Sequence, residues 1–260
     1  MKKTCVFVVV VMGLWLMVGG ALGIETPTAI AYKVVTKPVI DGVLSENEWN
    51  TSSPIIIAEE SQVIRDANMW SGPEDCSLKL YVMWDEENLY LAADVTENTT
   101  FGATDLLLLD WEDNMKLFLS TNPQDDPDRI TYSTTDFLLL LITDNMYWDT
   151  AFDRSMVEDN QRFTSKGMDG GQNVLTGFER AATTNATGYT FEAIIPWSNF
   201  SNENIPVYTP KAGDTIKFNY GITDISYACP GTEYVPQMAW TGDININTNP
   251  SLWGNLTFAE

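Results

Sequence analysis

Short runs of acidic residues are the first feature of this sequence that could perform chemistry. Asp125, Asp126 and Asp128 lie close together around a proline, and a second acidic run covers residues 110–113. Calcium takes six to eight oxygen ligands, which such loops supply at close spacing. We therefore expect structural calcium, with Asp125, Asp126 and Asp128 as candidate ligands. The alternative is that these acids only keep the protein soluble.

Catalysis is not expected. The sequence has no histidine, which removes the commonest general base, zinc ligand and haem ligand. It also lacks a nucleophile elbow, an HExxH motif, a Walker loop and paired CxxC motifs. Among 36 acidic residues, some pair will have the spacing that glycosidases use, but nothing marks which pair. We expect a protein that is not an enzyme and requires no cofactor, with structural calcium as an optional ion.

The net charge is −22. Nucleic acid and anionic membranes both attract Lys and Arg, so this balance argues against either as a partner. Neutral carbohydrate, calcium and simple solubility are all compatible with it.

The N-terminus has the pattern of a signal peptide. Lys2 and Lys3 precede an apolar run over residues 6–18, and small residues follow at 21–23. This pattern predicts cleavage after residue 23, a mature domain over residues 24–260, and a location outside the cell or on its surface. The run is short for a membrane span, so we expect no membrane insertion after cleavage. The alternative is a retained N-terminal anchor.

Two cysteines remain in the predicted mature chain, Cys76 and Cys229. An oxidising compartment permits one bridge between them, which the loop-entropy treatment credits with about 4–5 kcal/mol. The alternative is a pair of buried free thiols.

Most of the chain has the period of β-strands. Residues 78–84 and 89–95 alternate apolar and other side chains on either side of a short polar turn, which predicts a hairpin with one buried face. Further strands are predicted at residues 115–119, 136–142, 189–195, 216–222 and 256–258. No window of helical length has a 3.6-residue apolar period. The pattern favours a single all-β domain built from two packed sheets or a barrel.

Five segments also match an ordered set of motifs. Residues 38–49 (PVIDGVLSENEW) fit P-x-I-D-G-x-L-x-E-x-x-W, and residues 84–90 (WDEENLY) fit W-D-x-x-x-L-Y. Residues 188–197 (GYTFEAIIPW) fit G-Y-x-x-E-x-x-I-P-W. The last two are a G-x-x-I-x-F-N strand at 213–219 and a closing tryptophan followed by WGNL at 253–256. Packing alone explains these tryptophans, because alternating strands bury them.

In this order the motifs resemble the family 9 carbohydrate-binding modules and the DOMON-like group around them. The resemblance covers nearly the whole predicted mature chain. It implies a jelly-roll-like β-sandwich of roughly ten strands, often with structural calcium, that binds carbohydrate.

The resemblance also places the sugar-binding residues. Family 9 modules hold a sugar between two tryptophans, and the first stands just before a strand of the D-x-V-E-I-F type. Trp111 occupies that position here, with Asp110, Glu112 and Asp113 beside it. An indole plane stacks on the apolar face of a sugar, and carboxylates accept hydrogen bonds from its hydroxyls. The alternative is a loop tryptophan tucked against the edge of the sandwich.

Two positions depart from the family pattern. Asn247 stands where the second tryptophan is expected, and Lys116 replaces an acid. Trp70 and Trp148 are not required by the strand pattern, so either could supply the missing aromatic plane.

Two functions follow. The first is non-catalytic binding of extracellular carbohydrate through surface aromatics. The second is a structural or assembly role at the cell surface, in which edge strands of the sandwich join neighbouring subunits without a sugar site.

Overall fold

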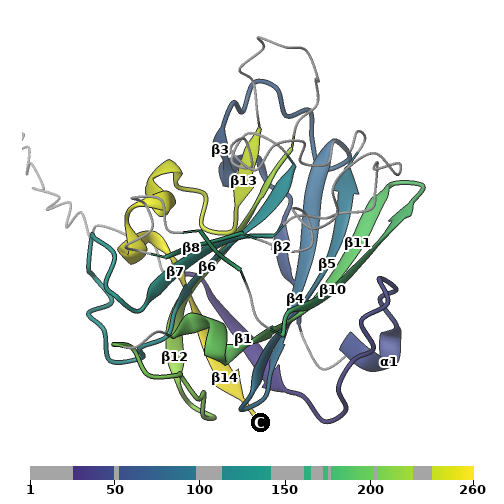
Figure 1. The fold of residues 1–260 in the computed structure, drawn as a ribbon. Coiled ribbons are helices and arrows are strands. Elements are labelled where there is room, and N and C mark those ends of the chain that lie inside the picture. Colours follow the sequence, from purple (N-terminus) through teal and green to yellow (C-terminus); the bar gives the residue numbers. More distant parts are fainter. Residues whose placement is uncertain are drawn as a thin grey trace, which may run out of the picture.

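The structure, a computed structural model, describes residues 26–49, 53–97, 113–141, 161–164, 172–174, 177–201, 204–224 and 236–260. Within these ranges nearly all regular structure is β-strand (Figure 1). The predicted signal peptide, residues 1–23, lies outside them. None of the helices in the described ranges has the length and apolar character needed to cross a membrane.

The strands form two layers. The first layer contains β10 (Glu179–Asn185), β11 (Gly188–Pro196), β5 (Asn88–Glu97), β4 (Cys76–Trp84) and β2 (Ile55–Ile57). The second contains β14 (Gly254–Ala259), β12 (Thr215–Thr223), β6 (Asn114–Ser120), β7 (Asp136–Leu141), β8 (Gln161–Thr164) and β9 (Gln172–Val174). Strand β1 (Thr28–Lys33) pairs in parallel with both β14 and β4 and so connects the layers.

The predicted all-β sandwich is confirmed. Four of its strands have only three residues each, so the count exceeds the roughly ten that were expected. The predicted hairpin is β4 and β5, which pair antiparallel over the whole of β4 and over residues 89–97 of β5. Two of the short strands, β3 (Val63–Arg65) and β13 (Gln237–Ala239), pair with each other, and β13 also pairs with β12.

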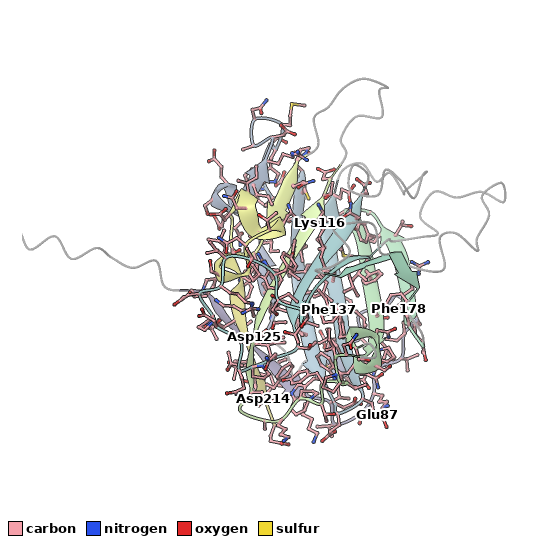
Figure 2. The ribbon with its side chains drawn as sticks, turned by 60° about the vertical axis from the view of Figure 1, so that its left-hand side comes forward. Glu87, Lys116, Asp125, Phe137, Phe178 and Asp214 are labelled. Atoms are coloured by element: carbon pink, nitrogen blue, oxygen red, sulfur yellow. The ribbon has the colours of Figure 1, made fainter. Side chains whose placement is uncertain are left out.

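The main core lies between the two layers. Alternate residues of β4, β5 and β11 face alternate residues of β6, β7, β12 and β14, and nearly all are apolar and fully buried. Figure 2 shows how side chains fill this space, with Phe137 of β7 among them. Burial of this many apolar side chains is the main favourable term that holds the layers together.

Two smaller clusters cover the outer faces. On the first layer, residues 34–49, including the short helix α1 (Glu46–Trp49), pack on Met83, Tyr90 and Ala92. On the second layer, Phe118, Trp253 and Ile246 pack together beneath the 3₁₀ turns η5 (Ile244–Asn247) and η6 (Pro250–Leu252). Two further turns are η1 (Glu60–Gln62) and η4 (Trp197–Phe200).

A buried carboxylate joins the first and third motifs. One oxygen of Glu192 accepts hydrogen bonds from the backbone N–H groups of Asp41 (3.0 Å) and Gly42 (2.7 Å), and the other accepts from the Trp49 indole (2.8 Å). Gly42 has a φ of 82°, a conformation that glycine adopts without strain. Burial raises the pKa of Glu192 above its usual value. These motif residues therefore attach the N-terminal segment to the sheet.

Another carboxylate organises the β4–β5 turn. Asp85 accepts hydrogen bonds from the backbone N–H groups of Glu87 and Asn88 and, at 2.6 Å, from the Tyr90 hydroxyl. The Trp197 indole donates to the Asp85 carbonyl at 2.9 Å. The second and third motifs thus meet at one turn, and the tryptophan is buried, as predicted.

The closing motif is explained by contact between a ring and a glycine. A Cβ placed on Gly254 would lie 2.3 Å from Cζ3 of Trp240. Only a residue without a side chain leaves room for that indole, so Trp240 and Gly254 are required together.

Replacing Gly254 with alanine is expected to lower the free energy of unfolding by about 1–3 kcal/mol, because the added methyl overpacks the site. Urea unfolding measures this loss. In a Trp240→Leu background the same change should cost less than half as much. Equal costs in the two backgrounds would show that the Trp240 ring does not impose glycine.

Replacing Glu192 with alanine is expected to cost about 2–4 kcal/mol, because three N–H groups lose their acceptor. Glu192→Gln keeps one acceptor oxygen and should lose less. Thermal and urea unfolding of both variants measure the difference. The role assigned to Glu192 is wrong if the alanine variant is as stable as the unaltered protein.

Candidate functional site

The inner face of the sandwich is apolar along most of its length. At one end of the molecule, the inward residues of three strands are acidic instead. Along β5 the inward residue after Val95 is Glu97, and along β12 the inward residue after Ile222 is Asp224. Asp113 precedes β6 in the same phase. Because alternate residues of a strand share a face, all three carboxylates face the space between the layers.

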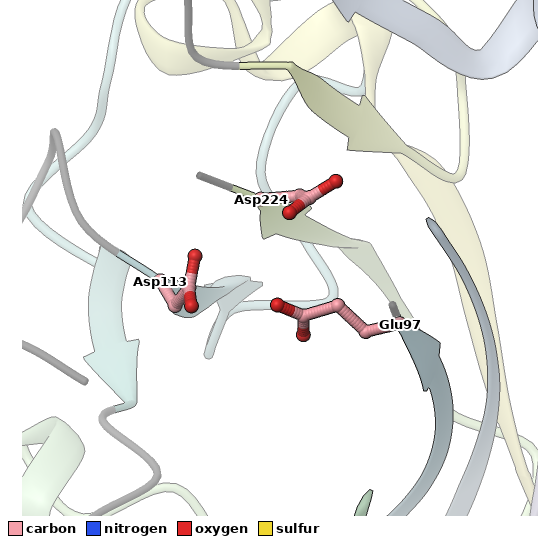
Figure 3. A group of neighbouring side chains, drawn as sticks. All are labelled: Glu97, Asp113 and Asp224. Atoms are coloured by element: carbon pink, nitrogen blue, oxygen red, sulfur yellow. The ribbon is translucent and has the colours of Figure 1, made fainter. Parts of the chain in front are cut away.

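These three carboxylates converge, as Figure 3 shows. One oxygen from each of Glu97, Asp113 and Asp224 lies within 4.8 Å of the others. The exposed fractions of the three residues are 5%, 1% and 2%. Burying charge in this way is costly unless the charges are paired or bound to a cation.

Among the three acids, Glu97 has the strongest requirement for a hydrogen-bond partner or a cation. Neither of its carboxylate oxygens has a hydrogen-bond partner within the described ranges. Burial, followed by the charges of Asp113 and Asp224, raises its pKa to about 10. Burial therefore favours the neutral form of this carboxyl unless a cation lies beside it.

The acid cluster lies in a buried part of the molecule, where a fourth acid, Asp75, is also buried. Cys76 lies opposite Glu97 in the β4–β5 register and is fully buried. Tyr189 of β11 packs into the same part of the core, and its pKa is raised by burial and by the charges of Glu97 and Asp113. Such surroundings strengthen electrostatic interactions in the cluster.

Two of the predicted sugar-binding residues, Trp70 and Asp113, lie at this end. Trp70 is half-buried, packs against the core and donates its indole N–H to the Cys76 carbonyl at 2.8 Å. Cys76 pairs with Glu97, and a Glu97 oxygen lies within 4.8 Å of an Asp113 oxygen. Trp70 and Asp113 therefore belong to one end of the sandwich.

The remaining predicted sugar-binding residues lie elsewhere or outside the described residues. Four of them lie outside the described residues: Trp111, Asp110, Glu112 and Trp148. Asn247 is half-buried in η5, which packs on the outer face of the second layer and not in the acid cluster.

The predicted calcium loop is at the opposite end of β6. Asp113 precedes β6, whereas Asp125 follows it, and Figure 2 shows Asp125 well away from Lys116 at the start of the strand. Asp125 accepts hydrogen bonds from Asn122 (2.5 Å), Ser133 (2.7 Å) and Thr135 (2.6 Å).

The rest of that loop is also held by its own hydrogen bonds. Asp126 accepts from the backbone N–H of Asp128, and Arg129 donates to the Asp126 carbonyl. Within the described ranges, three acidic side chains converge at the Glu97 end and not in this loop. The hydrogen bonds of Asp125 and Asp126 are sufficient to explain the loop as a structural turn.

A cleft of about 260 Å³ lies beside the same loop. Its lining includes Asn122, Asp125, Arg129, Lys217 and Asn255. No aromatic side chain lines it among the residues that the structure describes, so it lacks the flat apolar surface on which a sugar ring stacks.

Sequence reasoning missed Glu97 and Asp224. Both could have been found from the sequence, because each stands at the next inward position of a strand whose other inward residues are apolar. An acid at an inward position requires a partner or a cation, and it could have been noticed from the phase of the strand alone.

Comparisons with known proteins fit this architecture. The family described as carbohydrate family 9 binding domain-like matches residues 40–260. Endo-1,4-beta-xylanase A of Thermoanaerobacterium saccharolyticum is 26% identical over 187 residues, which are 71% of this chain and 13% of that protein. The chain therefore spans only a small part of that relative.

Two solved structures share the fold. Both are of a family 9 carbohydrate binding module from Caldicellulosiruptor kristjanssonii, at 19% identity. The complex with cellotriose has a TM-score of 0.59 and covers 90% of this chain and 94% of the module. The complex with glucose has a TM-score of 0.56 and covers 88% and 95%.

Cys76 is a buried free thiol in the structure, and Cys229 lies outside the described residues. Burial raises the pKa of the Cys76 thiol well above its usual value, so little reactive thiolate is present.

We expect iodoacetamide to label Cys76 only after denaturation. Mass spectrometry of the labelled peptides, with and without guanidinium, measures this. Rapid labelling of the native protein would contradict the burial of Cys76, and no labelling in denaturant without reductant would indicate the bridge to Cys229.

Proposed function

Because this chain belongs to the carbohydrate family 9 binding domain-like family, its function is carbohydrate binding, and we propose that it captures short β-linked glucan chains without cleaving them. The family match over residues 40–260 is the observation that carries this conclusion. Cellotriose and glucose, the ligands in the two solved complexes that share its fold, support the choice of a glucan.

We propose that the sugar binds at the end of the sandwich that carries the acid cluster. Trp70 and Asp113 both lie at that end, and Trp111 comes two positions before Asp113 in the sequence. An indole supplies an apolar plane for the ring of a glucose unit, and Asp110 or Glu112 would accept hydrogen bonds from its hydroxyls.

The buried carboxylates support a binding role over a catalytic one. A glycosidase places two carboxyl groups on either side of a substrate bond, about 5–9.5 Å apart. The exposed fractions of Glu97, Asp113 and Asp224 are 5% or less, and their nearest oxygens lie within 4.8 Å of one another. A sugar chain has no room between them.

We also propose that the protein is exported from the cell. Residues 1–23 would direct the chain out of the cell, and residues 24–260 would act as one domain on extracellular polysaccharide. This part of the proposal rests on the sequence alone.

A sheet edge favours a second candidate function, self-association. Strand β10 pairs with β11 on one side and ends the path of the first layer. Another copy could add a strand to this edge. Its outward residues are polar, which disfavours such pairing. Size-exclusion chromatography separates the candidates: a strictly monomeric protein leaves carbohydrate capture alone.

Replacing Trp111 with alanine is expected to weaken cellotriose binding at least about tenfold, because loss of one stacked ring costs on the order of 1.4 kcal/mol or more. Trp111→Phe keeps an aromatic plane and should retain most of the affinity. Isothermal titration calorimetry measures both, with thermal unfolding as the control for folding. The assignment of Trp111 fails if its alanine variant binds as tightly as the unaltered protein. The proposal of a glucan ligand fails if the unaltered protein binds neither cellotriose nor longer glucans.

A further inference from the structure

We propose that Glu97, Asp113 and Asp224 form a calcium site that ties the two layers of the sandwich together at one end. The three residues come from the ends of three strands that are far apart in the sequence, and this convergence is the observation that motivates the proposal.

The donor atoms indicate which metal would bind. All three are carboxylate oxygens, and the thiol of neighbouring Cys76 is not among them. A set of hard oxygen ligands favours calcium, magnesium or manganese over zinc or copper. Magnesium usually keeps several waters and binds through one or two carboxylates, whereas calcium accepts more carboxylate ligands in a flexible shell. The three oxygens lie within 4.8 Å of one another, which is close enough for one ion to contact all three.

The environment supplies an independent reason for a ligand. The exposed fraction of Glu97 is 5%, its carboxylate points between Asp113 and Asp224, and both its oxygens lack a hydrogen-bond partner within the described ranges (Figure 3). A buried carboxylate is normally hydrogen-bonded, paired or bound to metal. A cation at the centre of the cluster would satisfy both Glu97 oxygens and offset the repulsion among three acids.

The position of the site gives the cation a structural effect. Glu97 ends β5 in the first layer, whereas Asp113 and Asp224 flank β6 and β12 in the second. A bound cation would therefore link the layers where the apolar core ends. The chain continues from Glu97 and into Asp113 through residues 98–112, which include Trp111. If the proposed function is correct, calcium fixes both ends of the segment that carries the stacking tryptophan.

Calcium is expected to raise the melting temperature of the protein by about 5–10 °C when its free concentration is a hundredfold above Kd. Differential scanning calorimetry in EDTA and in calcium chloride measures the shift. Glu97→Gln and Asp224→Asn should melt close to the unaltered protein in EDTA and lose most of the calcium-dependent shift.

Asp128→Asn is the matched control, since it removes an exposed acid of the loop at the opposite end of β6. This variant should keep the whole shift. Loss of the shift in Asp128→Asn, with retention in Glu97→Gln, would overturn the proposal and assign calcium to the loop. Absence of any shift in the unaltered protein would also overturn it.

Terbium luminescence provides a second readout that does not depend on stability. Tyr189 packs beside the cluster and should sensitise emission from bound terbium, which calcium then displaces. Emission should be strongly reduced in Glu97→Gln and unchanged in Asp128→Asn. Equal emission from all variants would place the ion elsewhere and contradict the proposal.

Sugar binding is measured separately so that the two proposals can fail separately. Cellotriose titrations in calcium and in EDTA are expected to differ at least about threefold in affinity. Calcium binding at the cluster without any cellotriose binding would leave the metal site intact and reject the proposed ligand. Cellotriose binding that is unaffected by EDTA, in a protein without a calcium-dependent melting shift, would reject the metal site and leave the proposed function.

Discussion

The central physical constraint on this molecule is that its two layers must bury a continuous apolar surface between them. That surface is supplied by alternate residues of long strands, and it excludes charge over most of the length of the core. At one end the alternation continues but the side chains become carboxylates. Three acids then share a space in which unpaired charge is costly, which makes this end chemically different from the rest of the molecule.

The motifs that identify the family mostly serve this packing. Glu192 holds the N-terminal segment through Gly42 and Trp49, and Gly254 leaves room for Trp240. These residues would be needed in any sandwich of this type, whatever it binds. Family membership therefore establishes the architecture and the general function, whereas the choice of sugar depends on residues beyond the motifs.

The sequence predicted the strands that have a clear apolar alternation, and β4 and β5 are the best example. It did not predict β10, whose residues ERAATTN have no apolar alternation. That strand forms because the edge of β11 offers backbone partners over its whole length, which is a tertiary effect. Strands as short as β3 and β13 escape prediction because three residues are too few to show a period.

The candidate site was predictable only in part. Trp70 and Asp113 were predicted as site residues, and the structure brings them to the same end. Glu97 and Asp224 were missed because acidic residues are common in a chain of this charge, and only the strand phase separates an inward acid from an outward one. The metal prediction for the loop at Asp125 rested on its composition and stays a prediction, and in the structure Asp125 accepts hydrogen bonds from neighbouring residues.

A crystal structure of the protein grown with calcium and cellotriose tests most directly whether this end of the sandwich is the functional end. We expect an anomalous peak between Glu97, Asp113 and Asp224, and a glucose ring stacked on an indole at the same end. Cellotriose bound in the cleft near Asp125, with no ion among the three buried carboxylates, would contradict it.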